Sequence, residues 1–96
     1  MLDRLRKEDF VPLLGDKLKV CAGNSETELE VKEVVSLAAP SPRAAAPFYV
    51  VLRSRDGWRA AQGMFRIEHP ELGALELFTV PIGPDGEGLC YQIIFN

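Results

Sequence analysis

The sequence predicts a mainly β protein: six antiparallel strands in a meander that forms a small barrel or sandwich, with one short N-terminal helix. Three observations support this fold class. Apolar and polar residues alternate over short runs, and glycine, proline, asparagine and aspartate separate those runs. The length of 96 residues suits one core, so we expect a single β domain over residues 1–96.

The first expected element is a short helix over residues 7–14. Acidic residues lie in its first turn, Pro12 comes early enough to be tolerated, and a glycine follows its last apolar residue. Phe10, Leu13 and Leu14 would share one face by the i, i+3, i+4 rule. We expect that face to close one end of the core.

Two strands should follow the helix. Lys17–Ala22 alternates as a half-buried strand, and a Gly-Asn-Ser turn leads to a second run over residues 27–37. Strict alternation in this second run would point Glu33 into the core beside apolar neighbours. A β-bulge near Lys32 or Glu33 would turn that carboxylate outward and bring Val34 in.

The middle of the chain combines a loop with the best candidate for the central strand. Residues 38–47, AAPSPRAAAP, are of low complexity, and we expect an exposed loop that adds little to the core. Residues 48–52 are apolar at every position, which is typical of a strand buried on both faces. Asp56-Gly57 then predicts a hairpin to the next strand.

Three alternating runs complete the fold. Residues 63–69 lead through a turn into a strand over 74–82, in which Pro81 limits the strand or marks an edge. The glycine-rich turn at 84–88 precedes a final run that continues to the last residue. Because the expected connections are turns or loops and none is a helix, parallel βαβ architecture is excluded.

The composition argues against some classes of binding partner and indicates a cellular location. The net charge of −3 argues against a dedicated nucleic-acid-binding protein. Uninterrupted apolar runs are too short to span a membrane, and the first residues mix both charge signs instead of forming a secretory signal. We therefore expect a cytoplasmic protein with neither nucleic acid nor membrane as partner. Cys21 and Cys90 are too few for a disulfide framework, and we expect both to be reduced.

The residue patterns do not point to catalysis, so we expect a non-enzymatic protein with no cofactor and no metal. His69, the only histidine, precedes Pro70 at a turn, where hydrogen bonding to the backbone is the favoured role. Neither Cys21 nor Cys90 has a sequence neighbour that would activate a nucleophile. The sequence also contains no P-loop, nucleophile-elbow, zinc-protease or calcium-loop motif.

Arginine beside tryptophan marks a candidate interaction surface. Arg53, Arg55 and Arg59 lie around the expected hairpin with Trp58 among them, a composition favoured at interaction hot spots. The alternative is that these are ordinary surface charges with Trp58 folded onto the core. An acidic ladder on the second strand, Glu26, Glu28, Glu30 and Glu33, is more often a solvated face than a binding site.

The final strand is a second candidate surface. It has no lysine or proline to block its edge, and exposed edges invite strand pairing. We therefore expect a homodimer or pairing with a β-rich partner, with Ile94 in the interface. The alternative is that the first strand or the N-terminal helix covers this edge, as closure into a barrel would do.

Three segments carry a family resemblance: FRIEHPELGALELFTVPIGP at residues 65–84, KEDFVPLLG at 7–15, and the terminal YQIIFN. Together they resemble a family of small bacterial proteins known only as a domain of unknown function, and the resemblance covers nearly the whole chain. It implies a loose association with phage-tail-collar or microcystin-dependent-type proteins and a bacterial accessory role. It brings no catalytic residues to carry over.

The function that ranks first is a non-enzymatic protein-interaction or assembly module, accessory to phage-tail-like particles. The alternative is a small-molecule or glycan-binding β-barrel whose mouth would be lined by Tyr49, Trp58, Phe78 and Tyr91. An enzymatic function ranks third, because a catalytic site would need a cluster of side chains around His69.

Overall fold

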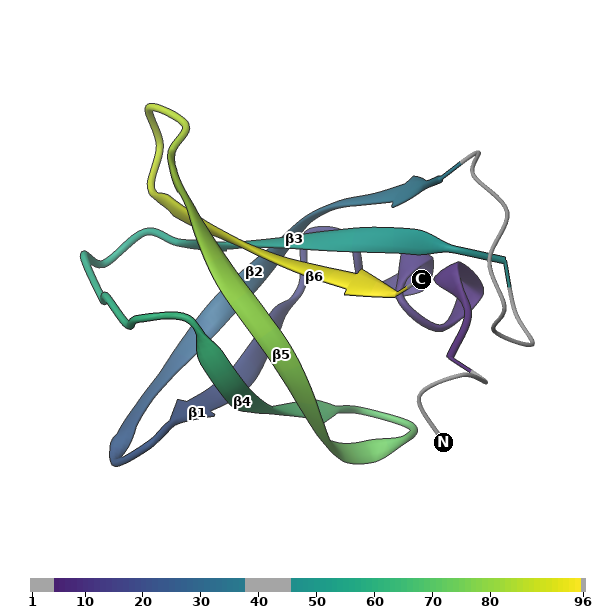
Figure 1. Cartoon of the computed structure of the whole chain (residues 1–96), viewed down its shortest axis with the longest axis horizontal. Helices are drawn as coiled ribbons and strands as arrows, with labels where there is room; N and C mark the ends of the chain where they lie inside the picture. Colours follow the sequence, from purple (N-terminus) through teal and green to yellow (C-terminus); the bar gives the residue numbers. More distant parts are fainter. Residues whose placement is uncertain (1–4, 38–45, 96) are drawn as a thin grey trace.

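The structure, a computed structural model, describes residues 5–37 and 46–95. Its six strands close into one barrel in which each strand pairs antiparallel with two neighbours (Figure 1), which confirms the predicted fold class as a barrel. The described elements are η2 (Lys7–Asp9), η3 (Val11–Leu13), β1 (Lys17–Ala22), β2 (Ser25–Ser36), β3 (Phe48–Ser54), β4 (Gly63–His69), β5 (Gly73–Pro84) and β6 (Leu89–Phe95).

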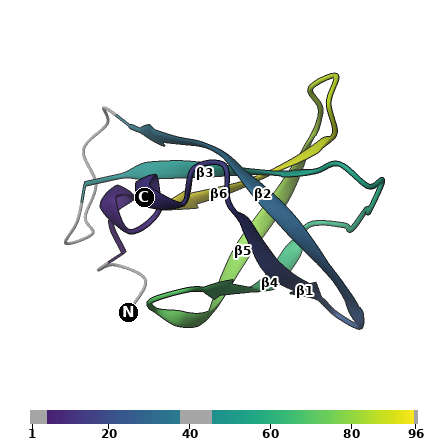
Figure 2. The ribbon, with the colours of Figure 1, turned by 180° about the vertical axis from the view of Figure 1, so that it is seen from behind.

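The order of strands around the barrel corrects the expected meander. It runs β1-β2-β3-β6-β5-β4, so that two three-stranded meanders lie side by side and β4 closes onto β1 (Figure 2). β3 pairs with β6 over its whole length and not with β4. The hairpin predicted at Asp56-Gly57 is therefore wrong: the chain from β3 to β4 crosses the end of the barrel instead of folding back on its own strand.

β2 carries the predicted bulge. Its register with β3 shifts between Val31 and Glu33, which leaves Lys32 as the extra residue. Glu33 is exposed, whereas Val34 packs against the core, as the apolar pattern required. The bulge therefore keeps a carboxylate out of the core and places the Lys32 side chain on the outer wall.

Side chains from every strand fill the interior of the barrel. Inward residues alternate with outward ones as the period of two predicted, and Tyr91, Phe10, Phe48 and Phe65 are the largest that are fully buried. β3 is the predicted strand buried on both sides, since Val51 on its outer side is also buried.

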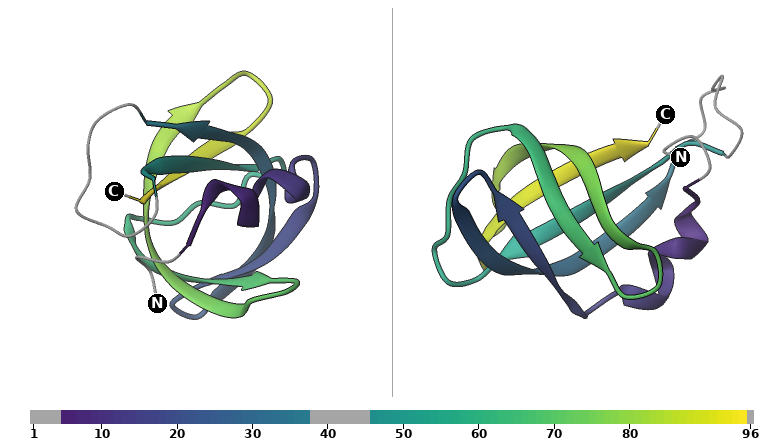
Figure 3. Two further views of the ribbon diagram at one scale, coloured as in Figure 1. Left: turned by 90° about the vertical axis from the view of Figure 1, so that its right-hand side faces the viewer. Right: turned by 90° about the horizontal axis from the view of Figure 1, so that it is seen from below.

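The predicted short helix over residues 7–14 is confirmed and consists of two 3₁₀ turns, η2 and η3. In the end-on view these turns lie across one opening of the barrel (Figure 3, left). Because a 3₁₀ turn has three residues, Phe10 and Leu13 share the buried face and Leu14 points outward, which corrects its predicted burial. In the part of the chain that the structure describes, no helix is long and apolar enough to cross a membrane.

Aromatic rings join these turns to the barrel. The Phe10 ring lies 6.0 Å from Phe48 and 5.5 Å from Phe95, which themselves stack at 4.4 Å. The His69 ring meets Phe10 edge-on at 5.3 Å and is buried. Its ring nitrogens are hydrogen-bonded to backbone groups only, as the sequence predicted for a turn histidine.

The connection from β3 to β4 closes the opposite end, at the left of Figure 1. Trp58 packs against Phe65 and Tyr91 at 5.9 and 5.6 Å, and its indole N–H donates to Ser25 Oγ at 2.7 Å. The Tyr91 hydroxyl accepts from Ala60 N at 3.1 Å and donates to the Trp58 carbonyl at 3.3 Å. The connection is therefore fastened to the core by both packing and hydrogen bonds.

The predicted Ala/Pro-rich loop over residues 38–47 lies outside the described residues except for its last two. The Leu37 N–H donates to the Pro47 carbonyl at 3.0 Å, so the two strand ends that flank this segment lie side by side.

Candidate functional site

The five residues of the predicted interaction surface do not form one surface. Arg53 is buried and Arg55 is exposed within the same ion-pair network, while Trp58 packs on the end of the barrel. Arg59 is exposed on the connection to β4, and Ile94 is exposed on the outer side of β6. The free edge predicted for the final strand is wrong, because β6 pairs with β3 on one side and with β5 on the other. The structure thus separates a charged hollow around the arginines from an apolar region around Ile94.

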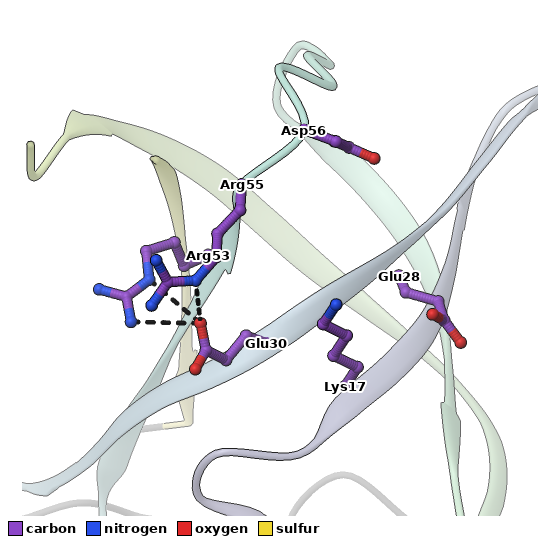
Figure 4. A pocket seen from close by; sticks show the side chains of 6 residues that line it. All are labelled: Lys17, Glu28, Glu30, Arg53, Arg55 and Asp56. Atoms are coloured by element: carbon purple, nitrogen blue, oxygen red, sulfur yellow. Dashed lines mark hydrogen bonds and ion pairs between the residues drawn. The ribbon is translucent and has the colours of Figure 1, made fainter. Parts of the chain in front are cut away.

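The charged hollow has a volume of about 250 Å³ and lies beside the start of β1, the middle of β2 and the end of β3 (Figure 4). Antiparallel register places Lys17 and Arg53 on either side of Glu30. Cations and carboxylates are equal in number in its lining, so the hollow does not favour a ligand of one sign. The lining residues are Lys17, Glu28, Glu30, Arg53, Arg55 and Asp56.

Glu30 is shared by two arginines. Its Oε1 accepts from Arg55 Nε at 2.9 Å and from Arg53 Nε and Nη2 at 3.3 and 3.2 Å (Figure 4). The hydrogen bond from Arg55, followed by that from Arg53, holds the pKa of Glu30 below its usual range. Both guanidinium groups are thus already engaged by a carboxylate of the same chain.

A second carboxylate, from the turn between β5 and β6, completes the network. Asp85 Oδ2 accepts from Arg53 Nη1 at 2.7 Å and lies 2.9 Å from Lys32 Nζ, while its Oδ1 accepts from the backbone N–H groups of Glu87 and Gly88. These interactions, the Glu87 N–H foremost, hold the pKa of Asp85 well below its usual range. The network fastens this turn to β2 and β3, which is a structural role.

The thiols are held in their protonated form. Cys21 Sγ donates to Glu26 Oε2 at 3.3 Å, and this hydrogen bond is the main cause of its raised pKa. Burial raises the pKa of Cys90. Both cysteines are free, as expected. Within residues 5–37 and 46–95, His, Cys, Asp and Glu side chains do not gather in groups of three that could hold a metal ion.

A contiguous apolar face covers the outer wall, and apart from Ile94 the sequence reasoning missed it. Cross-strand pairing aligns Met64 with Phe78, and Ile94 with Tyr49. Four of its members, Met64, Phe78, Ile82 and Ile94, are each about half exposed. We define the apolar face as Val35, Tyr49, Met64, Phe78, Val80, Ile82 and Ile94, with Gln92 at its centre.

The opposite wall of the barrel is charged. The outward positions of β1, of β4 beyond Met64, and of the facing parts of β2 and β5 carry Lys17, Lys19, Glu26, Glu28, Arg66, Glu68 and Glu76. Cross-strand ion pairs form between Lys19 and Glu26 at 3.6 Å and between Arg66 and Glu76 at 4.0 Å. Of the predicted acidic ladder, Glu26 and Glu28 belong to this solvated wall, Glu30 to the arginine network, and Glu33 to the edge of the apolar face opposite Val51.

The aromatic mouth predicted for the alternative function does not form. Tyr91 is buried inside the barrel and Trp58 covers its end, whereas Phe78 is exposed and Tyr49 half-buried on the outer wall. The four rings thus point to different sides of the wall and do not line one cavity.

Searches of curated proteins and of solved structures found no match to the chain. A family described as a domain of unknown function, DUF6916, matches residues 5–95. This match covers every strand of the barrel and both 3₁₀ turns. It also confirms the resemblance to a family of unknown function that the sequence carried. The chain therefore belongs to the DUF6916 family.

Proposed function

We propose that the barrel is a non-enzymatic protein-interaction or assembly module that docks through its apolar face. One observation carries this proposal: four large apolar side chains, each about half exposed, gather on the outer wall of β4, β5 and β6. Contiguous exposed apolar surface of this kind marks sites of protein contact. Transfer of such area from water contributes about 25 cal/mol per Å² on docking.

The composition and shape of the apolar face favour a protein over a small ligand. Methionine and aromatic residues are enriched in protein interfaces, and the apolar face presents Met64, Phe78 and Tyr49. It lies on the outer wall of the barrel, whereas small ligands prefer concave sites. The charged hollow is the concave alternative, but its arginines are already paired with Glu30.

The setting of this module is part of the proposal. We place it in the cytoplasm, where free thiols such as those of Cys21 and Cys90 are the rule. A bacterial origin and an accessory role in phage-tail-like particles are supported by the family resemblance alone. An assembly role of that kind would use the same apolar face.

Site-specific photo-crosslinking tests the proposal. A benzophenone side chain replaces Phe78 in the apolar face, and in a matched variant it replaces Leu72, which is also exposed but lies in the hairpin between β4 and β5. In cells of the organism that makes the protein, irradiation should give discrete covalent protein adducts at position 78 and none at 72. The proposal is overturned if position 78 gives no adduct, or the same diffuse adducts as position 72.

A further inference from the structure

We infer that the apolar face binds a second copy of this chain, in a two-fold symmetric pair centred on Ile94 and Gln92. The inference rests on the proposed function and names its partner. Self-recognition requires that one surface complement itself. The charge distribution, the side-chain sizes and the area of the apolar face each bear on that requirement.

The charge distribution permits self-contact. The centre of the apolar face carries Gln92, an amide that both donates and accepts and can therefore pair with its symmetry mate. Arg53, whose register partner Cys90 lies two positions from Gln92 on β6, is neutralised by Glu30 and Asp85. Glu33 is an exposed carboxylate at the β2 edge of the apolar face, opposite Val51, and in a pair centred on β6 its two copies lie at opposite edges of the contact.

The net charge of −3 does not oppose such a pair at close range. Glu33 lies at the β2 edge of the apolar face, whereas exposed Glu26, Glu28 and Glu68 lie on the opposite wall, across a molecule whose shortest extents are 27 and 23 Å. Two copies that meet through their apolar faces keep those charges farther apart than the screening length of about 8 Å at physiological ionic strength. Docking through the charged wall would instead bring like charges together.

Side-chain sizes around β6 are complementary under a two-fold axis. β6 lies between β5 and β3, so an axis parallel to β6 places the β5 residues of one copy opposite the β3 residues of the other. Exposed Phe78 then faces half-buried Tyr49, whereas Met64 on β4 and Val35 on β2 lie toward the rims of the contact, where the wall of the closed barrel curves away. A more exposed side chain thus meets a less exposed one, and Ile94 contacts its own symmetry mate near the axis.

The area sets the strength of the pair. With strands about 4.8 Å apart and outward residues about 6.8 Å apart, each outward residue occupies about 33 Å² of the wall, so the eight residues of the apolar face, Gln92 included, cover about 260 Å². A standard interface buries about 800 Å² per partner. The dimer therefore belongs to the weak class, with dissociation in the micromolar range of about 10 to 100 μM.

Sedimentation equilibrium of the purified full chain tests the inference. Wild type should show a monomer–dimer equilibrium between about 5 and 300 μM, a range that brackets a weak interface. Ile94→Lys places two ammonium groups near the axis and should weaken dimerisation by about tenfold or more. Leu72→Lys adds the same charge to an exposed apolar site outside the apolar face and should leave it unchanged. A wild-type chain that stays monomeric throughout overturns the inference, as does an Ile94→Lys dimer of undiminished affinity.

A cross-linking experiment tests the same inference without relying on the Ile94→Lys variant, which could misfold. In a Cys21→Ser background, Ile94→Cys and Leu72→Cys are each treated with a bis-maleimide spanning about 8 Å, close to the 10 Å spacing of packed sheets. Position 94 should give covalent dimers in high yield and position 72 should not; equal yields contradict the pair. If the purified chain is monomeric while the Phe78 photo-adducts contain another protein, the self-association is wrong and the proposed function stands. If no adducts form at all, both fail.

Discussion

The ring of His69 donates from Nε2 to the backbone oxygen of Asp9, across 2.6 Å and 60 positions of sequence. Its Nδ1 accepts from the backbone N–H groups of Glu71 and Leu72, each at 3.1 Å, which places the ring proton on Nε2. One buried side chain thus closes the hairpin between β4 and β5 and holds the N-terminal turns on the barrel. Its geometry explains a histidine at this turn without any catalytic role.

Two replacements of His69 should distinguish its contact with the β4–β5 hairpin from its contact with Asp9. His69→Leu leaves the Asp9 carbonyl and two turn N–H groups without their partner, and we expect a loss of about 2–3 kcal/mol in the free energy of unfolding. In His69→Asn the amide oxygen can take the place of Nδ1 but cannot reach Asp9, so the loss should be about half as large. Urea denaturation of both variants measures the difference.

Equal losses in the two variants would show that the turn contacts contribute nothing. A loss below about 0.5 kcal/mol in His69→Leu would contradict the anchoring role, because surface substitutions fall in that range. Glu68→Gln, at an exposed neighbouring position, provides the control and should stay within it.

Trp58 should behave as part of the core and not as an interaction hot spot. Trp58→Ala removes a half-buried ring that packs on Phe65 and Tyr91, and we expect a loss of about 2–3 kcal/mol in the free energy of unfolding. Trp58→Phe keeps the ring but loses the indole hydrogen bond to Ser25, at a cost of about 1 kcal/mol. Arg59→Ala, at the exposed neighbour, is the control and should change stability by less than about 0.5 kcal/mol.

The readout is again urea denaturation, combined with sedimentation at fixed concentration. A Trp58→Ala chain of unchanged stability but altered association would restore Trp58 to an interaction surface and contradict this assignment.

Local patterns in the sequence predicted the strands and the bulge, because each depends on neighbouring residues. Alternation gives the inward set of every strand, and a buried Glu33 could be avoided only by a shift in β2. The pairing partner of β3 depends on contacts far along the chain, and the Asp56-Gly57 signal indicated the wrong one. The length of the segment from β3 to β4 and the tryptophan within it were the available signs of a crossover.

The wrong prediction of the pairing partner of β3 also prevented the prediction of the apolar face. Only when β3 lies beside β6 do Tyr49 and Ile94 become neighbours and the apolar face become continuous. Arg53 was predicted at the surface because arginine is usually exposed, yet Asp85 from a distant turn pairs with it and its side chain is mostly buried. Neither relationship has a signature in the residues adjacent in sequence.

Gly88 is a position where the backbone excludes any side chain. A Cβ there would overlap the backbone carbonyl oxygen of Ser54 at the end of β3. Gly88→Ala must therefore shift the turn against β3, and we expect a loss of about 1–3 kcal/mol in the free energy of unfolding. Gly63→Ala is the matched control, since a Cβ at Gly63 meets open space and its φ is not positive.

Thermal and urea denaturation of the two alanine variants test this prediction. Gly63→Ala should be neutral or slightly stabilising, because alanine restricts the unfolded chain more than glycine does. Equal effects at the two positions would mean that the close approach of Gly88 to Ser54 does not limit the fold.

The Asp85 network should make stability depend on pH in the acid range. The pKa of Asp85 is held well below its usual range by the Glu87 N–H, Lys32 and Arg53, so the folded state favours the carboxylate. For a carboxylate with a lowered folded pKa, the stabilisation is complete above the unfolded pKa of about 3.9 and is lost as the pH falls toward the folded pKa. Wild type should therefore lose stability progressively below about pH 5.

Asp85→Asn tests this dependence, because an amide can still accept from the turn N–H groups but cannot pair as an anion with Lys32 and Arg53. The urea midpoint of the variant should lie below that of wild type at pH 7, and the gap should narrow between pH 5 and pH 2.5, because Asp85 of the unfolded wild-type chain takes up a proton in this range while the folded chain keeps the carboxylate. Glu68→Gln, on the exposed side of β4, should follow the wild-type profile. Parallel profiles for wild type and Asp85→Asn over this range would show that the ion pairs of Asp85 are no stronger in the folded state than water around a free carboxylate, and the turn between β5 and β6 would then be held by its backbone hydrogen bonds alone.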